Sequence, residues 1–200
     1  QLRSFSEAEY PDQPVTLVYL GGFYAWHGIT ILLCALEKVL RRAGKVHLLL
    51  IGSGAGEAEA RTLVERLGMT DQVQFLGQMG DQEYAPLLAG ADIGLSPYCG
   101  WPEYSGLKLF DYKAAGLACV ASGQNGQPQT LMHAETGWIV PPCDVEALAA
   151  ALCELIADHS LRRRLGQAAR IEAESTHDWK HTTDKVEKLL ASTIAKRGNS

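Results

Sequence analysis

The sequence predicts an α/β fold, a doubly wound parallel six-stranded sheet of the Rossmann-like type, followed by C-terminal helices. Six short apolar runs stand out, and segments with helical spacing lie between them. The runs are continuous rather than alternating, as expected of strands that are covered on both faces. With 46% hydrophobic residues, the 200-residue chain can bury the core that such a sheet requires.

The predicted strands span residues 15–20, 46–51, 73–77, 91–97, 117–122 and 137–142. After Gly28, apolar residues recur at intervals of three and four and predict the first helix: Ile29, Leu32, Leu33, Leu36, Val39 and Leu40. Arg41, Arg42 and Gly44 favour its end, because basic side chains and glycine suit a helix C-terminus. The same pattern predicts helices over 57–67, 81–88, 107–115, 145–157, 160–173 and 179–195.

Composition limits the classes of partner. A formal net charge of −5 argues against non-specific binding to nucleic acid or to an anionic membrane, because both require a dense basic surface. No run of about 18 apolar residues predicts a transmembrane segment. The five cysteines lie mostly in apolar runs without a CxxC pair, so we expect buried thiols in a reducing, cytoplasmic compartment.

The sequence begins with Gln1 rather than Met, and its first residues are polar. We therefore expect a piece of a longer protein, with a linker over residues 1–14. One ligand-binding domain should follow over 15–177. Residues 178–200 are expected to form a C-terminal helix and a frayed tail.

Ligands of doubly wound sheets bind beyond the carboxyl ends of the strands, in the loops that lead into the helices. The loop after the second predicted strand reads "GSGAGE" (52–57), which is close to a dinucleotide-binding fingerprint. The sixth place, where that fingerprint needs glycine, is Glu57, whose carboxylate would repel a pyrophosphate. We therefore interpret this loop as a tight turn that lines a pocket rather than as a dehydrogenase site.

The loop after the first predicted strand reads "GGFYAWHG" (21–28). Gly21 and Gly22 would let a ligand approach the backbone closely, and His27 would stand at the entry to the next helix. A histidine at a helix start is also common as a surface or capping residue, so both interpretations stay open on the residues alone. We expect Phe23 and Trp26 to be packing residues.

Two carboxylates flank the start of the helix predicted over 107–115, Glu103 before it and Asp111 within it. Ser105 is expected to cap this helix. The amides that follow would point outward and attract phosphate, namely those of Gly106, Leu107 and Lys108, and the Lys108 side chain would add a positive charge. Asp111 could then accept hydrogen bonds from a sugar or ribose. Alternatively, Glu103 is a solvated loop acid, and Asp111 caps the helix or pairs with Lys108 or Lys113.

Together these motifs make residues 15–172 resemble the C-terminal, donor-binding domain of a retaining GT-B glycosyltransferase of family four, the glycosyl transferases group 1. The matching stretches are "LGGFYAWHG", "GSG", "FLG", "ADIGLSP", "EYSGLKLFDYKAAGLACVAS" and "AETGWIVPPCDVEALAAAL". Each stretch is weak alone, but their order and spacing are specific. The resemblance implies transfer of a hexosyl group from a nucleotide-diphosphate sugar to a carbohydrate or lipid-linked acceptor, with retention and without a metal or other cofactor.

The resemblance also implies roles for the matching residues. Glu103, the candidate catalytic residue, would contact hydroxyls of the donor sugar, and Asp111 would bind the nucleotide ribose. The backbone of Gln78 and Met79 would border the base. Helix amides would hold the diphosphate, and the donor-binding residues around it are Gly21, Gly22, His27, Ser105, Gly106, Leu107 and Lys108.

Four positions depart from the family pattern. Gly22 and His27 stand where the family has an arginine and a lysine that grip the diphosphate. Asp111 and Gln129 each replace a glutamate. A charge-assisted hydrogen bond to phosphate contributes about 1.5 to 3 kcal/mol, so the lost cations matter most. Protonated His27 would restore part of this energy, and we expect nucleotide affinity to weaken as pH rises through neutrality.

We favour hexosyl transfer in carbohydrate biosynthesis, with this chain as the donor-binding half that transfers nothing alone. The family places the acceptor on a separate N-terminal domain, so the acceptor would reach this chain through that domain. The alternative is a degenerate nucleotide-binding or scaffold domain, and a third possibility is a nucleotide-sugar epimerase. We expect a cytoplasmic protein, peripheral at the inner membrane face in its full-length form, with Tyr98, Trp101 and Tyr104 on the exposed side of the site.

Overall fold

The computed structural model of the chain describes residues 14–43, 45–100, 106–124, 128–176, 183–184 and 186–191. Its strands are β1 Val15–Leu20, β2 Val46–Ile51, β3 Val73–Gly77, β4 Ile93–Ser96, β5 Ala118–Ser122 and β6 Trp138–Val140. They form one parallel sheet in the order β3-β2-β1-β4-β5-β6. The strand order reverses between β1 and β4, which is the doubly wound arrangement, and the predicted fold class is confirmed.

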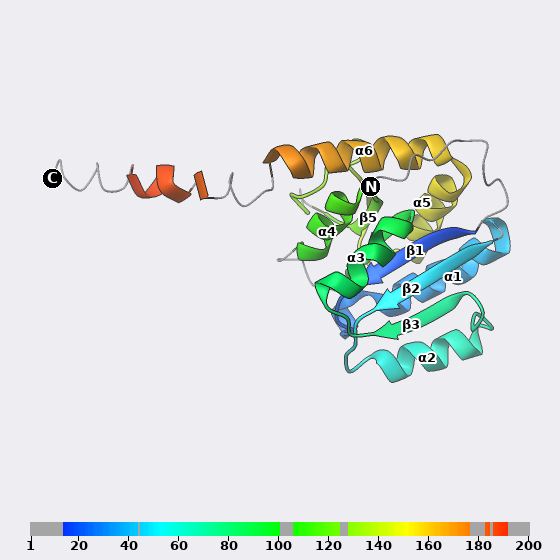
Figure 1. Cartoon of the computed structure of the whole chain (residues 1–200). Coiled ribbons are helices and arrows are strands. Elements are labelled where there is room, and N and C mark those ends of the chain that lie inside the picture. The colour runs from blue at the N-terminus through cyan, green and yellow to red at the C-terminus, as the bar shows by residue number, and fades with distance from the viewer. Residues whose placement is uncertain are drawn as a thin grey trace.

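The helices are η1 Ala25–His27, α1 Ile29–Ala43, α2 Glu57–Arg66, α3 Asp81–Gly90, α4 Leu107–Ala115, α5 Val145–Ala157 and α6 His159–Thr176. Residues 183–184 and 186–191 are also helical, and in Figure 1 they lie beyond α6, away from the sheet. The rest of the helix predicted over 179–195 lies outside the described residues. Of the described helices, none is long and apolar enough to span a bilayer.

Helices cover both faces of the sheet (Figure 1). One apolar cluster joins α1, α2 and α5 to the sheet, and a second joins α3 and α4 to its other face. The apolar stripe of α1 forms the centre of the first cluster and consists of Ile29, Leu32, Leu33, Leu36 and Val39. Since burial of apolar surface is the main favourable term in folding, these two clusters fix the loops at the carboxyl edge of the sheet.

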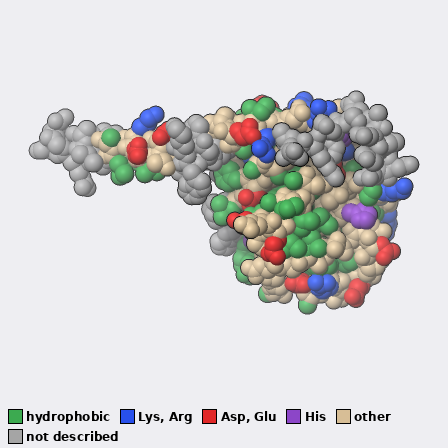
Figure 2. Space-filling model, viewed as in Figure 1, with side chains coloured by type: hydrophobic (Ala, Val, Ile, Leu, Met, Phe, Trp, Pro, Cys, Tyr) green, Lys and Arg blue, Asp and Glu red, His purple; other side chains and the backbone are tan. Residues whose placement is uncertain are grey.

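The charges on the surface are mixed. Figure 2 shows acidic and basic side chains interspersed on the viewed face, in keeping with the small net charge of the sequence. Ion pairs join Arg61 to Glu57 within α2 and Arg170 to Glu174 within α6. The face viewed in Figure 2 therefore has no large area of one charge sign that would attract a polyanion.

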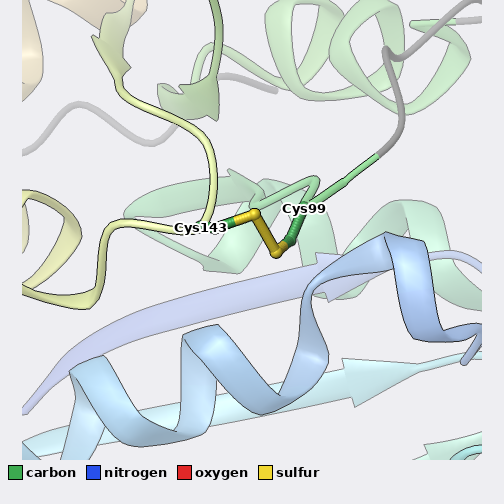
Figure 3. Close-up of a disulfide and its surroundings, with 2 residues drawn as sticks. All are labelled: Cys99 and Cys143. Carbon is green, nitrogen blue, oxygen red and sulfur yellow. A yellow bond between two sulfur atoms is a disulfide. The ribbon is translucent and has the colours of Figure 1, made fainter.

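The expectation that all five cysteines are thiols is wrong. Cys99 and Cys143 form a disulfide with an S–S distance of 2.09 Å, whereas Cys34, Cys119 and Cys153 are free (Figure 3). Cys99 lies in the loop after β4 and Cys143 in the turn between β6 and α5. The carboxyl ends of parallel strands share one edge of a sheet, which is how residues 44 apart in sequence can meet.

Candidate functional site

The loops after β1, β2 and β4 contact one another backbone to backbone at the carboxyl edge of the sheet. A Cβ atom on Gly52 would lie 1.9 Å from the carbonyl oxygen of Gly21, and one on Gly28 would lie 1.5 Å from that of Pro97. Gly54 packs in the same way against the backbone of Phe23. The glycines of "GSGAGE" thus allow three loops to pack closely, which agrees with a tight turn.

His27 points into the first loop. Its Nδ1 lies 2.5 Å from the carbonyl oxygen of Gly22, and the Tyr19 hydroxyl donates to the same oxygen at 2.7 Å. Because a carbonyl only accepts hydrogen bonds, the contact with Gly22 requires the proton to be on Nδ1. The side chain is half-buried and ends η1, whereas α1 begins two residues later at Ile29, so His27 does not cap α1.

Two aromatic residues of this loop behave differently. Phe23 is buried, with its ring centroid 6.1 Å from that of Phe75, as expected of a packing residue. Trp26 is 44% exposed and stacks on Tyr24 at 5.1 Å, so its predicted packing role is wrong. The short η1 turn buries none of its residues, which leaves the indole ring at the surface.

Lys108 brings a cation to the first loop from α4. The side chain is buried, at 8% exposure, and its Nζ donates to the Tyr98 hydroxyl at 3.0 Å. The same Nζ lies 4.4 Å from the centroid of the Tyr98 ring and 5.6 Å from that of Tyr19, both within range of cation–π attraction. Its Cε lies 3.2 Å from the position of a Cβ on Gly21. The ammonium group therefore lies beside the glycines of the first loop.

The start of α4 differs from the prediction. The helix begins at Leu107, and Gly106 rather than Ser105 occupies the N-cap position, with a left-handed φ of 42° that favours glycine. The amide of Leu109 donates to the carbonyl oxygen of Gly106 at 2.9 Å. The amides at the start of a helix point outward along its axis, in a direction that attracts an anion. The Leu107 side chain is 68% exposed and faces solvent. Glu103 and Ser105 lie outside the described residues, as do Trp101 and Tyr104.

Asp111 faces α3. Burial raises the pKa of this half-buried carboxyl, the nearby Asp81 carboxylate raises it further, and hydrogen bonding to the Tyr84 hydroxyl opposes both. The same environment raises the pKa of Tyr84 to about 12. Asp81 begins α3, directly after the β3–α3 loop that contains the exposed Gln78 and the half-buried Met79.

The alternative in which Asp111 pairs with a lysine is not supported by the described contacts. Lys113 is fully buried, and its Nζ lies 2.8 Å from Oε2 of Glu172 and donates to the carbonyl oxygen of Thr130 at 2.8 Å. The Lys108 Nζ donates to the hydroxyl of Tyr98, after β4, and lies 5.6 Å from the ring centroid of Tyr19, in β1. Asp111 is therefore turned towards the start of α3, where the base and ribose are expected.

Three residues near the site escaped the sequence analysis or were given no binding role there: Tyr19, Tyr98 and Thr130. Tyr19 and Tyr98 contact both His27 and Lys108. Thr130 lies against Gly106, and its buried Oγ1 has no hydrogen-bond partner in the described part of the chain. The sequence could have indicated Tyr19, because a tyrosine near the carboxyl end of a strand can place its hydroxyl in the binding site. We find no sequence signal for Thr130.

The structure brings Gly21, Gly22, His27 and Lys108 together and places the start of α4 in the same edge of the sheet. Asp111, Gln78 and Met79 lie in or beside the α3–α4 face. Within the described ranges, no group of three or more His, Cys, Asp or Glu side chains could hold a metal ion. The arrangement offers helix amides and two basic side chains to one anionic ligand.

Comparison with known proteins gives a consistent result. Residues 2–172 match the family model described as "Glycosyl transferases group 1". A phosphatidyl-myo-inositol mannosyltransferase of Mycobacterium leprae is 32% identical over 193 residues, which are 96% of this chain and 50% of that protein. A GDP-mannose-dependent monoacylated alpha-(1-6)-phosphatidylinositol monomannoside mannosyltransferase of Corynebacterium glutamicum is 30% identical over 80% of this chain and 43% of that protein.

Among solved structures, the C-terminal domain of a glycosyl transferase group 1 family protein from Francisella tularensis has the same fold. The TM-score is 0.74 at 20% identity, covering 84% of this chain and 89% of that chain. The chain spans about half the length of the curated relatives it matches.

Proposed function

The chain belongs to the glycosyl transferases group 1 family, and we propose that it is the half of a GT-B enzyme that binds the nucleotide-sugar donor. The reaction would transfer a hexosyl group to a carbohydrate or lipid-linked acceptor with retention of configuration. The acceptor would be held by an N-terminal domain of the longer protein, so the isolated chain would bind donor and transfer nothing.

The donor we propose is GDP-mannose. This choice rests on the relatives: a mannosyltransferase is 32% identical to the chain, and a GDP-mannose-dependent mannosyltransferase is 30% identical. The acceptor would be a hydroxyl group of a lipid-linked polyol or sugar, as the names of the same relatives suggest. The reaction would take place at the surface of a membrane.

The observation that carries the proposal is the position of Lys108. The family pattern leads one to expect two cations in the first loop, and Gly22 and His27 occupy their places. In the structure the Lys108 ammonium reaches this loop from α4, and His27 lies beside it across the ring of Tyr98. A diphosphate on the first amides of α4 would therefore meet a permanent cation and a titratable one.

The remaining roles follow from the same placement. Asp111 would accept hydrogen bonds from the ribose hydroxyls, and the backbone of Gln78 and Met79 would border the base. Glu103 would contact the hydroxyls of the donor sugar. As the bond from the sugar to the diphosphate breaks, negative charge grows on the leaving oxygen, and Lys108, His27 and the helix amides would stabilise it.

A ligand panel tests this proposal. Thermal shift is measured with GDP, UDP and ADP and with GDP-mannose on the wild type, on Asp111→Ala and on Lys108→Met, with Lys38→Met on α1 as the matched control. Ligands that bind the native state raise the melting temperature. We expect GDP and GDP-mannose to give the largest shift, which Asp111→Ala and Lys108→Met reduce and Lys38→Met leaves intact. No shift with any nucleotide would refute donor binding.

The loss of the two family cations from the first loop favours one rival, a degenerate domain that binds nucleotide weakly or acts as a scaffold. Transfer of mannose from GDP-mannose by the full-length protein separates the two functions. We expect transfer by the full-length protein that Lys108→Met reduces at least about 10-fold. Nucleotide binding without transfer would favour the degenerate domain.

A further inference from the structure

Tyr98 contacts both basic side chains of the site. Its hydroxyl accepts a hydrogen bond from Lys108 Nζ at 3.0 Å, and its ring centroid lies 4.4 Å from the same nitrogen. Tyr98 also contacts His27, and the centroids of the two rings lie 4.9 Å apart. One phenol ring therefore touches the permanent cation and the titratable cation proposed to hold the diphosphate.

The residues on either side of Tyr98 are anchored. The carbonyl oxygen of Pro97 packs against Gly28 so closely that a Cβ there would lie 1.5 Å away. The amide of Cys99 donates to the carbonyl oxygen of Trp26 at 2.9 Å. Cys99 is also joined to Cys143, which ties this loop to the turn before α5 (Figure 3).

We propose that Tyr98 is a positioning residue of the diphosphate site and that the Cys99–Cys143 disulfide holds it in place. The inference rests on the proposed function, since it concerns how the donor's diphosphate is gripped. Lysine has a flexible four-carbon stem, so a fixed acceptor and a fixed ring face confine its ammonium group to one position. The disulfide limits how far the loop that bears Tyr98 can move from the turn between β6 and α5, and the Cys99 amide holds the same loop to the first loop.

The test separates phosphate contacts from contacts to the nucleoside. Affinities for GDP and for guanosine are measured on the 200-residue chain by competition against a fluorescent GDP analogue. Tyr98→Phe removes the hydroxyl and keeps the ring, and Tyr98→Leu removes both. Tyr24→Phe is the matched control, because Tyr24 is an exposed tyrosine of the first loop.

We expect Tyr98→Phe to weaken GDP binding about 2- to 10-fold, since one hydrogen bond is lost. Tyr98→Leu should weaken it about 5- to 50-fold, because the cation–π contact is lost as well. Guanosine binding should be unchanged in both variants, because guanosine has no phosphate. The salt dependence of GDP affinity should be smaller in both variants than in the wild type, because the attraction of the basic side chains for the diphosphate is weaker. Equal losses for GDP and guanosine would mean that Tyr98 only supports the loop, which overturns the proposal.

The disulfide is tested on the same scale with Cys143→Ser, and with Cys153→Ser as the control at a free cysteine. Dithiothreitol provides a second route: its two thiols reduce Sγ–Sγ to two thiols and close to a cyclic disulfide. Both changes should weaken GDP binding in the wild type and have no further effect in Tyr98→Leu. If breaking the disulfide weakens GDP binding by the same factor in Tyr98→Leu as in the wild type, the disulfide does not act through Tyr98. That result would overturn this part of the proposal.

Circular dichroism and melting temperature identify variants that fail to fold. If Tyr98→Leu fails to fold, Tyr98→Phe still tests the proposal, because it keeps the ring and removes only the hydroxyl. The two proposals fail in different ways. If the wild type binds no nucleotide, both are refuted. If the wild type binds GDP and the Tyr98 variants bind it equally well, donor binding stands and the positioning role is refuted.

Discussion

Helices α1 and α4 occupy equivalent places on opposite faces of the sheet, and they are held in opposite ways. Each follows a strand at the point where the strand order reverses, α1 after β1 and α4 after β4. The buried face of α1 is entirely apolar. That of α4 includes Lys108, Tyr112 and Lys113 beside Leu109.

The polar groups that α4 buries are matched by partners in other elements. The Tyr112 hydroxyl donates to the carbonyl oxygen of Leu95 at 3.1 Å and accepts from the amide of Leu20 at 2.8 Å, so it bridges the ends of β1 and β4. Lys113 ties α4 to α6 and to the β5–β6 loop. Helix α1 therefore acts through apolar packing, whereas α4 also fastens the loops that form the site through buried polar contacts.

The largest expected effect follows from breaking the buried ion pair of α4. Lys113→Met removes the cation that lies against Oε2 of Glu172, and we expect the free energy of unfolding to fall by about 3 to 5 kcal/mol. Urea unfolding measures the loss. Because an apolar pair avoids the unpaired charge, Lys113→Met with Glu172→Leu should recover most of the stability. If Lys113→Met alone is as stable as the wild type, the ion pair does not fasten α4 to α6.

The matching change on α1 should affect stability without affecting the site. Leu36→Ala opens a cavity in the larger apolar cluster and should cost about 2 to 5 kcal/mol. GDP affinity, measured at a temperature where the variant is folded, should equal that of the wild type. A loss of affinity comparable to that of Lys108→Met would show that both helices position the site.

A smaller effect is expected at His27, and it depends on pH. The imidazolium form binds a diphosphate more strongly than the neutral form, so GDP affinity should fall as pH rises from 6 to 8.5. His27→Ala should weaken GDP binding about 10-fold at pH 6 and much less at pH 8.5. Isothermal titration at several pH values measures this. A flat profile in the wild type would exclude the role.

The smallest effect is a gain in stability at Asp111. Burial and the Asp81 carboxylate raise the pKa of Asp111 in the folded state. The stability linked to such a group is present below its unfolded pKa, about 3.9, and is lost as pH rises through the folded pKa. Asp111→Asn should therefore raise the melting temperature at pH 7 but not near pH 3.5, while weakening GDP binding. A lower melting temperature at pH 7 would mean that the carboxylate stabilises the fold.

The fold could be predicted because it depends on the spacing of apolar residues, which can be recognised within short segments of the sequence. The helix predicted over 107–115 has those bounds in the structure, and the stripe from Ile29 to Val39 lies in the core as expected. The disulfide could not be predicted in this way, because Cys99 and Cys143 meet through the topology of the sheet and not through their spacing. Trp26 was misjudged because a single short turn has too few residues for a periodic signal.

The site could be predicted less completely. Motif order drew attention to the first loop and to α4, but it treated Gly22 and His27 as lost cations. That Lys108 fills this region depends on how far a long side chain extends from a neighbouring helix, which sequence spacing does not encode. The N-cap at Gly106 was missed for a similar reason, since serine is the usual cap and only backbone geometry favours glycine there.

The glycine contacts among the loops after β1, β2 and β4 limit how the domain can diversify. A methyl group on Gly28 or Gly52 would collide with the backbone of another loop, so these loops can only be varied together. New donor preferences are easier to evolve or engineer in the loops after β3 and β5, at positions such as Gln78 and Gln129, whose side chains are exposed. Libraries confined to those two loops should retain far more folded members than libraries that randomise the first loop.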